Sequence, residues 1–142
     1  MADSQYILEV NNLCQHFSSG RGKKKLTVKA VDDVTFGVRP AETFGLVGES
    51  GCGKTTTGRT IIRLYDPTGG EVLFNGRDIA GKMNPDLRKY LTDNIAMIFQ
   101  DPIESLNPKM TIEEIIGEGL TVRGMKDKAE IRKLVVEMLR KV

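Results

Sequence analysis

The sequence predicts an α/β fold from three observations. A short apolar segment, residues 42–47, precedes a glycine-rich turn, and a helical segment begins at Lys54. Segments rich in β-branched residues come before this unit, and an Asn75-Gly76 pair marks a hairpin after it. The last third of the chain carries helix-start signals and a helical apolar stripe. This mixture of strands and helices is typical of the α/β class.

The first half of the chain is expected to consist mainly of strands. Residues 6–13 read as one strand, and residues 26–38 as one or two, with a break near two consecutive aspartates. The polar and basic residues 18–25 between them are interpreted as a solvated loop. Residues 71–79 are expected to form a hairpin around the Asn-Gly turn.

The second half is expected to be mainly helical. Asn84 has the character of an N-cap, followed by proline and an acid, and this helix is expected to reach Asp93. Residues 95–99 form an apolar run that we expect to be a buried strand. Thr111 and Asp127 are expected to begin two further helices, each with a glutamate three residues later. The last helix is expected to bury one apolar stripe: Ile131, Leu134, Val135, Met138, Leu139 and Val142.

Composition narrows the class of protein. The chain has 142 residues and a formal net charge of +2, which gives no reason to expect nucleic acid as a partner. The two cysteines and one histidine show no metal-ligand spacing, which argues against a disulfide framework or a zinc site. We expect a reducing cytosolic compartment. The sequence contains no signal-peptide pattern and no apolar run long enough to cross a membrane.

Residues 48–55 match the complete motif G-x-x-x-x-G-K-[ST]. The expected strand before it and helix after it supply the context that this phosphate-binding loop requires. Gly48 and Gly53 allow the chain to turn, and Lys54 is expected to contact the β- and γ-phosphates. The hydroxyl of Thr55 is the expected Mg²⁺ ligand. Cys52 is interpreted as a spacer. The predicted phosphate-binding residues are Gly48, Ser50, Gly51, Cys52, Gly53, Lys54, Thr55 and Thr56.

Three stretches together resemble the nucleotide-binding subunit of ABC transporters, in particular the oligopeptide/dipeptide importer type. They are residues 48–56, residues 97–102, which are similar to the strand and Q-loop, and residues 105–111. The resemblance implies a P-loop NTPase fold of ABC type over residues 1–142. It implies an antiparallel β-subdomain (1–40 and 71–80), a phosphate-loop core reaching the Q-loop (41–70 and 81–100) and the start of a helical subdomain (101–142).

The resemblance also assigns roles to single residues. Phe17 lies where the family places an aromatic residue that stacks on adenine, whereas His16 beside it is interpreted as a loop residue facing solvent. Gln100 matches the Q-loop glutamine, whose amide oxygen binds Mg²⁺, so ATP and Mg²⁺ are the expected cofactors. Lys54 and Gln100 would contribute to catalysis, but no complete catalytic set is expected.

Several family motifs do not occur in these residues: the signature segment, the Walker B strand with its carboxylates, and the switch histidine. We therefore expect a truncated ABC ATPase domain whose parallel-sheet core is incomplete. The chain is expected to bind ATP at best and not to hydrolyse it at a useful rate. Unpaired strand edges are expected to favour self-association or strand swapping.

The resemblance implies the ATP-binding, energy-coupling subunit of a peptide importer. Its partners would be transmembrane permease subunits, a second ATP-binding subunit and, indirectly, an extracytoplasmic peptide-binding protein. It would lie in the cytoplasm on the inner face of the cell membrane. The alternatives are a non-catalytic nucleotide-binding module and an importer subunit for another cargo such as nickel. A small-molecule kinase or a non-transport ABC protein of DNA repair or translation agrees less well with residues 98–111.

Overall fold

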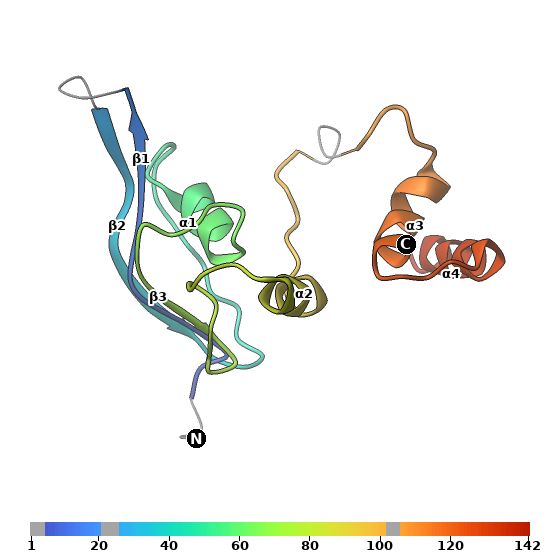
Figure 1. The fold of residues 1–142 in the computed structure, drawn as a ribbon, viewed down its shortest axis with the longest axis horizontal. Coiled ribbons are helices and arrows are strands. Elements are labelled where there is room, and N and C mark those ends of the chain that lie inside the picture. Colours follow the sequence, from blue (N-terminus) through green and yellow to red (C-terminus); the bar gives the residue numbers. More distant parts are fainter. Residues whose placement is uncertain (1–4, 21–25, 102–105) are drawn as a thin grey trace. The chain divides into compact units, whose positions relative to one another are not determined.

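The computed structural model describes residues 5–20, 26–101 and 106–142. The chain divides into two compact units, Met1–Met97 and Ile98–Val142, which are described separately below. The first contains a sheet with two helices and the second contains a pair of helices (Figure 1). None of the helices in the described part of the chain is long and apolar enough to cross a membrane.

The first unit is built on a four-stranded sheet. Its strands are β1 (Leu8–Ser19), β2 (Leu26–Val38), β3 (Gly69–Phe74) and β4 (Arg77–Asp78), in the order β2-β1-β3-β4. All three pairings are antiparallel, which confirms the expected antiparallel β-structure. The first strand extends to Ser19, further than the sequence suggested, and residues 26–38 form one strand. His16 therefore lies on β1 with a side chain that is 26% exposed and bonded to Asp32, so its interpretation as a loop residue facing solvent was wrong, as was the inclusion of residues 18 and 19 in the loop.

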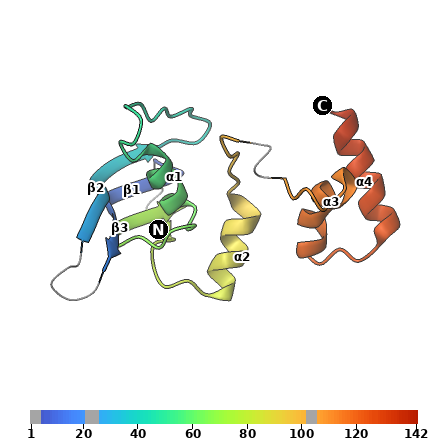
Figure 2. The ribbon, with the colours of Figure 1, turned by 90° about the horizontal axis from the view of Figure 1, so that it is seen from above.

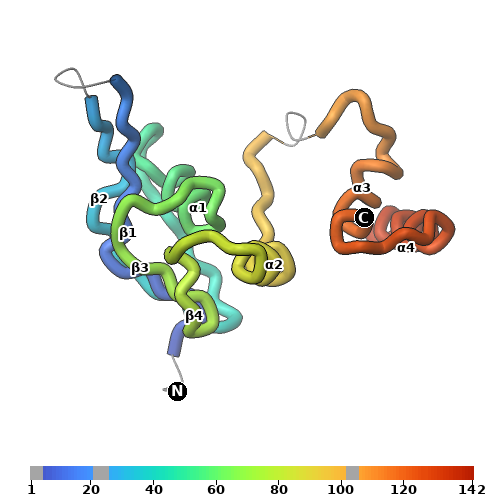
Figure 3. The backbone as a smooth tube through the Cα atoms, in the orientation of Figure 1, coloured from blue at the N-terminus to red at the C-terminus, as the bar shows by residue number. Residues whose placement is uncertain are grey.

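The turn between β3 and β4 follows from two residues with positive φ. Asn75 has φ 50° and Gly76 has φ 70°. Two consecutive residues with positive φ are what a type I′ turn needs, and its twist matches that of the flanking strands. The hairpin predicted from the Asn-Gly pair is therefore confirmed (Figure 3).

The break expected near two consecutive aspartates is a β-bulge inside a continuous strand. Leu13 pairs with Val34, whereas Gln15 pairs with Val31. Two residues of β2, Asp32 and Asp33, therefore lie opposite one residue of β1. Asp33 adopts the left-handed conformation with φ 58°, which its short polar side chain tolerates. The bulge places the carboxylate of Asp32 beside β1.

Helices cover one face of the sheet. Helix α1 (Lys54–Ile61) lies across the strands (Figure 2), and helix α2 (Pro85–Asn94) contributes two leucines to the same core. The predicted N-cap is confirmed, since the side chain of Asn84 accepts a hydrogen bond from the amide of Leu87 at 2.8 Å. The buried core consists of Val10, Leu13, Val31, Ile61, Val72, Ile79, Leu87 and Leu91.

Two expected strands are not formed. Residues 42–47 and 95–99 have no strand pairing in the described structure, so the strand assignments there were wrong. An extended segment becomes a strand only when a neighbour accepts its backbone hydrogen bonds, and the antiparallel sheet supplies none to either segment. Their apolar side chains remain exposed to a large extent: Phe44 43%, Leu46 43%, Val47 96%, Ile98 96% and Phe99 42%.

The second unit is an α-helical hairpin. Helix α3 (Ile112–Val122) packs on helix α4 (Lys128–Arg140). Both predicted N-caps are present: Thr111 forms a full capping box, and Asp127 accepts from two first-turn amides. The helices approach closely at Gly117, where an added Cβ would lie 2.9 Å from Cγ2 of Ile131. Glycine therefore sets the distance between these helices.

The apolar stripe of α4 is only partly buried. Val135 is 2% exposed, but Met138 is 43% exposed, Leu139 47% and Val142 fully exposed. The prediction of a fully buried stripe was therefore wrong over its last turn. The stripe follows the helical period, but α3 contacts only part of it, because burial depends on the partner and not on the period.

Acid should weaken the start of α3. The backbone and side chain of Thr111 donate to the carboxylate of Glu114 and lower its pKa below the ordinary value of 4.5. A lowered pKa in the folded state means that the charged form stabilises the helix above pH 4.5. That contribution should disappear as the pH falls below 4.5 through the folded-state pKa.

Circular dichroism melts of wild type and Glu114→Gln across this pH range test the prediction. Wild type should be the more stable at neutral pH, and the difference should shrink in acid. Two melting profiles that stay parallel at every pH would contradict the assignment.

Candidate functional site

The glycine-rich turn leads directly into α1. Gly53 is the N-cap of the helix and has φ 98°, in the left-handed region that favours glycine. A Cβ at this position would lie only 2.4 Å from the carbonyl oxygen of Ala30 on β2. Both the positive φ and the lack of space for a Cβ therefore require glycine at position 53.

Backbone donors at the start of α1 are available to a ligand. The amides of the first helical turn, Lys54, Thr55 and Thr56, have no partner within the helix. The N-cap makes no side-chain hydrogen bond to them, and the first turn carries no acidic residue. The amide of Cys52 is different, since it donates to the carbonyl of Glu49 at 3.3 Å. The free amides therefore lie together at the N-terminus of α1, where the helix dipole is positive and favours an anion.

The ammonium group of Lys54 lies over the turn. Its Nζ donates to the carbonyl oxygens of Gly48 and Glu49, both at 2.7 Å, and approaches Sγ of Cys52 at 3.5 Å. The lysine therefore neutralises carbonyl dipoles of its own loop in this structure. Because an ammonium prefers an anion to a neutral carbonyl, the side chain can exchange these contacts for phosphate oxygens.

The threonines of α1 divide into two groups. The hydroxyls of Thr57 and Thr60 donate to carbonyls one turn earlier, at 3.0 and 2.8 Å. The side chain of Thr55 is exposed, and no such hydrogen bond is recorded for it within the described residues. Its hydroxyl is therefore free to bind a cation or a ligand oxygen. Thr56 is half-buried, and its carbonyl accepts the bond from Thr60.

The aromatic residue Phe17 lies on β1 and is 40% exposed. Its ring meets that of Tyr65 edge-on, with centroids 5.2 Å apart and planes at 85°. Tyr65 follows α1, and its hydroxyl accepts from Arg59 of that helix at 3.4 Å. Sequence reasoning did not identify Tyr65, because nothing in the linear sequence connects it to Phe17. The contact fixes the phenylalanine ring while part of it remains accessible.

The sheet brings Phe17 and the turn to the same stretch of β2. Phe17 pairs with Val28, and the turn contacts Ala30 two residues further along.

Gln100 belongs to the second unit, where it is exposed, and its predicted role stays a prediction. Within the similar stretches, Pro102 and Ser105 lie outside the described residues, as does most of the basic loop 18–25.

The model of one protein family, described as "ABC transporter", matches residues 31–141. The chain belongs to the ABC transporter family. This match extends from β2 through the glycine-rich turn to the end of α4, so it includes most of the candidate site. The motif at residues 48–55, the helix after it and the family match therefore agree, whereas the strand expected before the motif is not formed.

Curated ABC proteins of bacteria are similar over nearly the whole chain. The oligopeptide transport ATP-binding protein OppF of Bacillus subtilis (strain 168) is 50% identical over 140 residues, which cover 98% of this chain and 45% of that protein. The dipeptide transport ATP-binding protein DppF of Lactococcus lactis subsp. cremoris (strain MG1363) is 46% identical over 145 residues, again with 45% of its length covered. The chain spans less than half the length of these relatives.

Solved ABC cassettes share the fold. The dimeric structure of the cassette MJ0796 superposes with a TM-score of 0.78 at 27% identity, covering 94% of this chain and 56% of that one. The protein cbiO1 from Clostridium perfringens, part of the ABC transporter complex cbiONQ, gives 0.70 at 25% identity, with 96% and 50% covered. The α/β fold class expected from the sequence is thus confirmed.

Proposed function

We propose that this chain binds Mg-ATP as part of the energy-coupling subunit of an ABC peptide importer. The observation that carries the proposal is the turn at residues 48–53, which presents uncapped first-turn amides of α1 together with the ammonium of Lys54. A triphosphate offers acceptor oxygens to the amides, and it offers the ammonium charged acceptors in place of two neutral carbonyls. The MJ0796 cassette, solved in a post-hydrolysis state bound to ADP and Pi, supports a nucleotide as the ligand.

Thr55 is the proposed Mg²⁺ ligand of the loop, because it offers an exposed hydroxyl at the start of α1. Gln100 of the second unit is a second proposed ligand through its side-chain amide oxygen, and this role rests on the family resemblance alone. Both are oxygen donors of the kind that Mg²⁺ uses together with water and phosphate oxygens. The bound ion would screen the charge of the phosphates. Lys54 and Gln100 would then take part in ATP hydrolysis by the complete subunit.

Peptide as the cargo rests on the relatives, which are named as oligopeptide and dipeptide transport ATP-binding proteins. In the proposed assembly the subunit works with a second ATP-binding subunit and with permease subunits in the membrane, on its cytoplasmic face. An extracytoplasmic peptide-binding protein would take part indirectly. The exposed apolar side chains of residues 42–47 support the further expectation that copies of this chain associate with one another.

Deletion of the gene that encodes this chain tests the cargo. Uptake of a labelled oligopeptide should stop, whereas uptake of labelled nickel should continue, and plasmid-borne wild type should restore peptide uptake. Loss of nickel uptake with intact peptide uptake would favour the nickel alternative. Intact uptake of both would favour a nucleotide-binding module without a transport role.

Replacement of Phe17 with alanine tests the proposed adenine contact. Stacking of a base on an aromatic ring contributes about 1–3 kcal/mol, so ATP binding should weaken about 5- to 150-fold. Binding of inorganic tripolyphosphate should not change, because it has no base, and this ligand is the internal control. Equal losses for both ligands would instead indicate that the substitution disturbs the loop. Titration calorimetry measures both affinities.

A further inference from the structure

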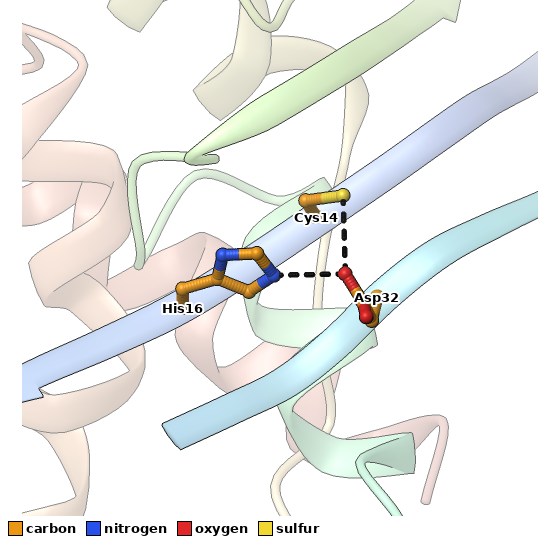
Figure 4. A group of neighbouring side chains, drawn as sticks. All are labelled: Cys14, His16 and Asp32. Atoms are coloured by element: carbon orange, nitrogen blue, oxygen red, sulfur yellow. Dashed lines mark hydrogen bonds and ion pairs between the residues drawn. The ribbon is translucent and has the colours of Figure 1, made fainter. Parts of the chain in front are cut away.

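Three side chains with metal-binding atoms meet between β1 and β2, and the proposed function does not use them. Cys14 and His16 come from β1 and Asp32 from β2 (Figure 4). Nε2 of His16 lies 3.0 Å from Oδ1 of Asp32, and Sγ of Cys14 lies 3.9 Å from the same oxygen. All three ligand atoms lie within 4.8 Å of one another.

Strand geometry explains why these residues meet. Cys14 and His16 are two residues apart, so their side chains point to the same side of β1. The bulge in β2 places two residues opposite Cys14, and Asp32 is one of them. The amide of the second bulge residue, Asp33, donates to Sγ of Cys14 at 3.4 Å and holds the sulfur toward β2. The backbone therefore prearranges the three ligands without a metal.

We propose that Cys14, His16 and Asp32 form a site for a zinc ion, with water in the fourth position. Zinc binds sulfur at about 2.3 Å and nitrogen or oxygen at about 2.0–2.2 Å, with tetrahedral geometry. Ligand atoms around such an ion lie about 3.3–3.7 Å apart, as tetrahedral geometry requires. The separations of 3.0 and 3.9 Å lie on either side of this range, and the third, between Sγ of Cys14 and Nε2 of His16, is at most 4.8 Å, so the side chains must rotate to close around the ion.

The choice of zinc follows from the donor atoms. A thiolate and an imidazole favour zinc over Mg²⁺ or Ca²⁺, which prefer oxygen ligands. The thiolate and the carboxylate together neutralise the two charges of the ion. On binding, the thiol proton of Cys14 passes to solvent, and the hydrogen bond between His16 and Asp32 is replaced by two bonds to the metal. No oxidant or reductant is needed.

One neighbouring charge opposes the ion. Nζ of Lys29 lies 3.0 Å from Oδ2 of Asp32, which leaves Oδ1 for the metal. The lysine orients the carboxylate but also repels a cation. The side chain of Asp33 is engaged elsewhere, since its Oδ1 accepts from Asn12 at 2.6 Å. The side chains of His16 and Asp32 are 26% and 48% exposed, so an ion in solution can reach them.

The sequence argued against a zinc site because its cysteines and histidine lack the spacing of known zinc motifs. The third ligand comes from a neighbouring strand, and linear spacing cannot show it. A zinc ion here would join β1 and β2 directly beside Phe17, the residue after His16. The site would therefore tie the strand that carries the proposed adenine contact to its neighbour.

Zinc titration of the 142-residue chain, in competition with a chromophoric chelator, tests the proposal. Wild type should bind one equivalent, and Cys14→Ser and His16→Ala should each weaken binding at least about tenfold, since loss of outer-shell partners alone has effects of this size. Asp32→Asn should also weaken binding, whereas the adjacent Asp33→Asn should not. Cys52→Ser is the matched control for the thiol and should bind zinc as wild type does.

Cobalt substitution provides a second measurement. Because it is made on the wild-type chain, it remains informative even where a variant fails to fold. Bound Co²⁺ should give a thiolate charge-transfer band that Cys14→Ser abolishes and Cys52→Ser retains. Lys29→Met should bind zinc more tightly than wild type, because a like charge is removed. Absence of the thiolate band in wild type, or unchanged zinc affinity in Cys14→Ser and His16→Ala, would overturn the proposal.

Discussion

Replacement of Lys54 with alanine is expected to weaken Mg-ATP binding about 10- to 150-fold. The ammonium lies over the loop, 2.7 Å from two of its carbonyl oxygens, and is positioned to transfer its hydrogen bonds to phosphate oxygens. A hydrogen bond to a charged group contributes about 1.5–3 kcal/mol, which sets this range. Tripolyphosphate binding should weaken by a similar factor, because the lost contacts involve phosphates and not the base.

The matched control is Lys89→Ala. Lys89 lies on α2 with a side chain that is 77% exposed and paired with Asp93, so its removal lowers the net charge equally without touching the loop. Nucleotide affinity should change less than about twofold, because the Lys89 side chain is exposed and lies outside the loop, where water and salt screen its charge. Equal losses in the two variants would mean that the effect is long-range charge and that Lys54 makes no specific contact.

Replacement of Gly53 with alanine is expected to destabilise the first unit strongly. A non-glycine residue in a sparsely populated region of φ costs of order 1–3 kcal/mol, and the new Cβ would also lie 2.4 Å from the carbonyl oxygen of Ala30. The carbonyl belongs to β2 and cannot move away without disturbing the sheet. The free energy of unfolding, measured in urea, should therefore fall by at least this amount, and ATP binding should be lost.

Two other glycines separate strain from steric contact. Gly51 has φ 81° but open space around it, so Gly51→Ala should show the strain alone. Gly58 lies inside α1 with no atom near its added Cβ, and Gly58→Ala should stabilise the helix by about 0.5–1 kcal/mol. The expected order of stability is Gly58→Ala, then Gly51→Ala, then Gly53→Ala. A Gly53→Ala variant as stable as wild type would contradict the structure of the turn.

The elements that the sequence predicts best depend on local chemistry. The caps at Asn84, Thr111 and Asp127 and the turn at Asn75 involve bonds between residues only a few positions apart, and the structure contains all of them. Residues 42–47 and 95–99 have the composition of strands but need a distant neighbour, and composition does not report on neighbours. The predicted burial of the last turn of α4 was wrong for the same reason, since burial also depends on a neighbouring element.

The features of the candidate site also differ in whether they depend on local sequence or on contacts between distant residues. The proposed phosphate-binding loop is one contiguous motif, so the sequence alone names all the residues proposed to form it. The proposed role of Phe17 came from the family resemblance. Neither that resemblance nor the residue pattern predicted its contact with Tyr65. The meeting of Cys14 with Asp32 depends on a bulge whose register is set by pairing across two strands. Contacts of this kind can be identified only from the three-dimensional structure.

Titration calorimetry of the folded 142-residue chain with Mg-ATP tests the central claim most directly, namely that the turn before α1 binds the phosphates of a nucleotide. The account predicts one binding site, competition by inorganic pyrophosphate, and weaker binding in Lys54→Ala. A folded wild-type chain that releases no heat with Mg-ATP, and binds neither pyrophosphate nor sulfate, would contradict it.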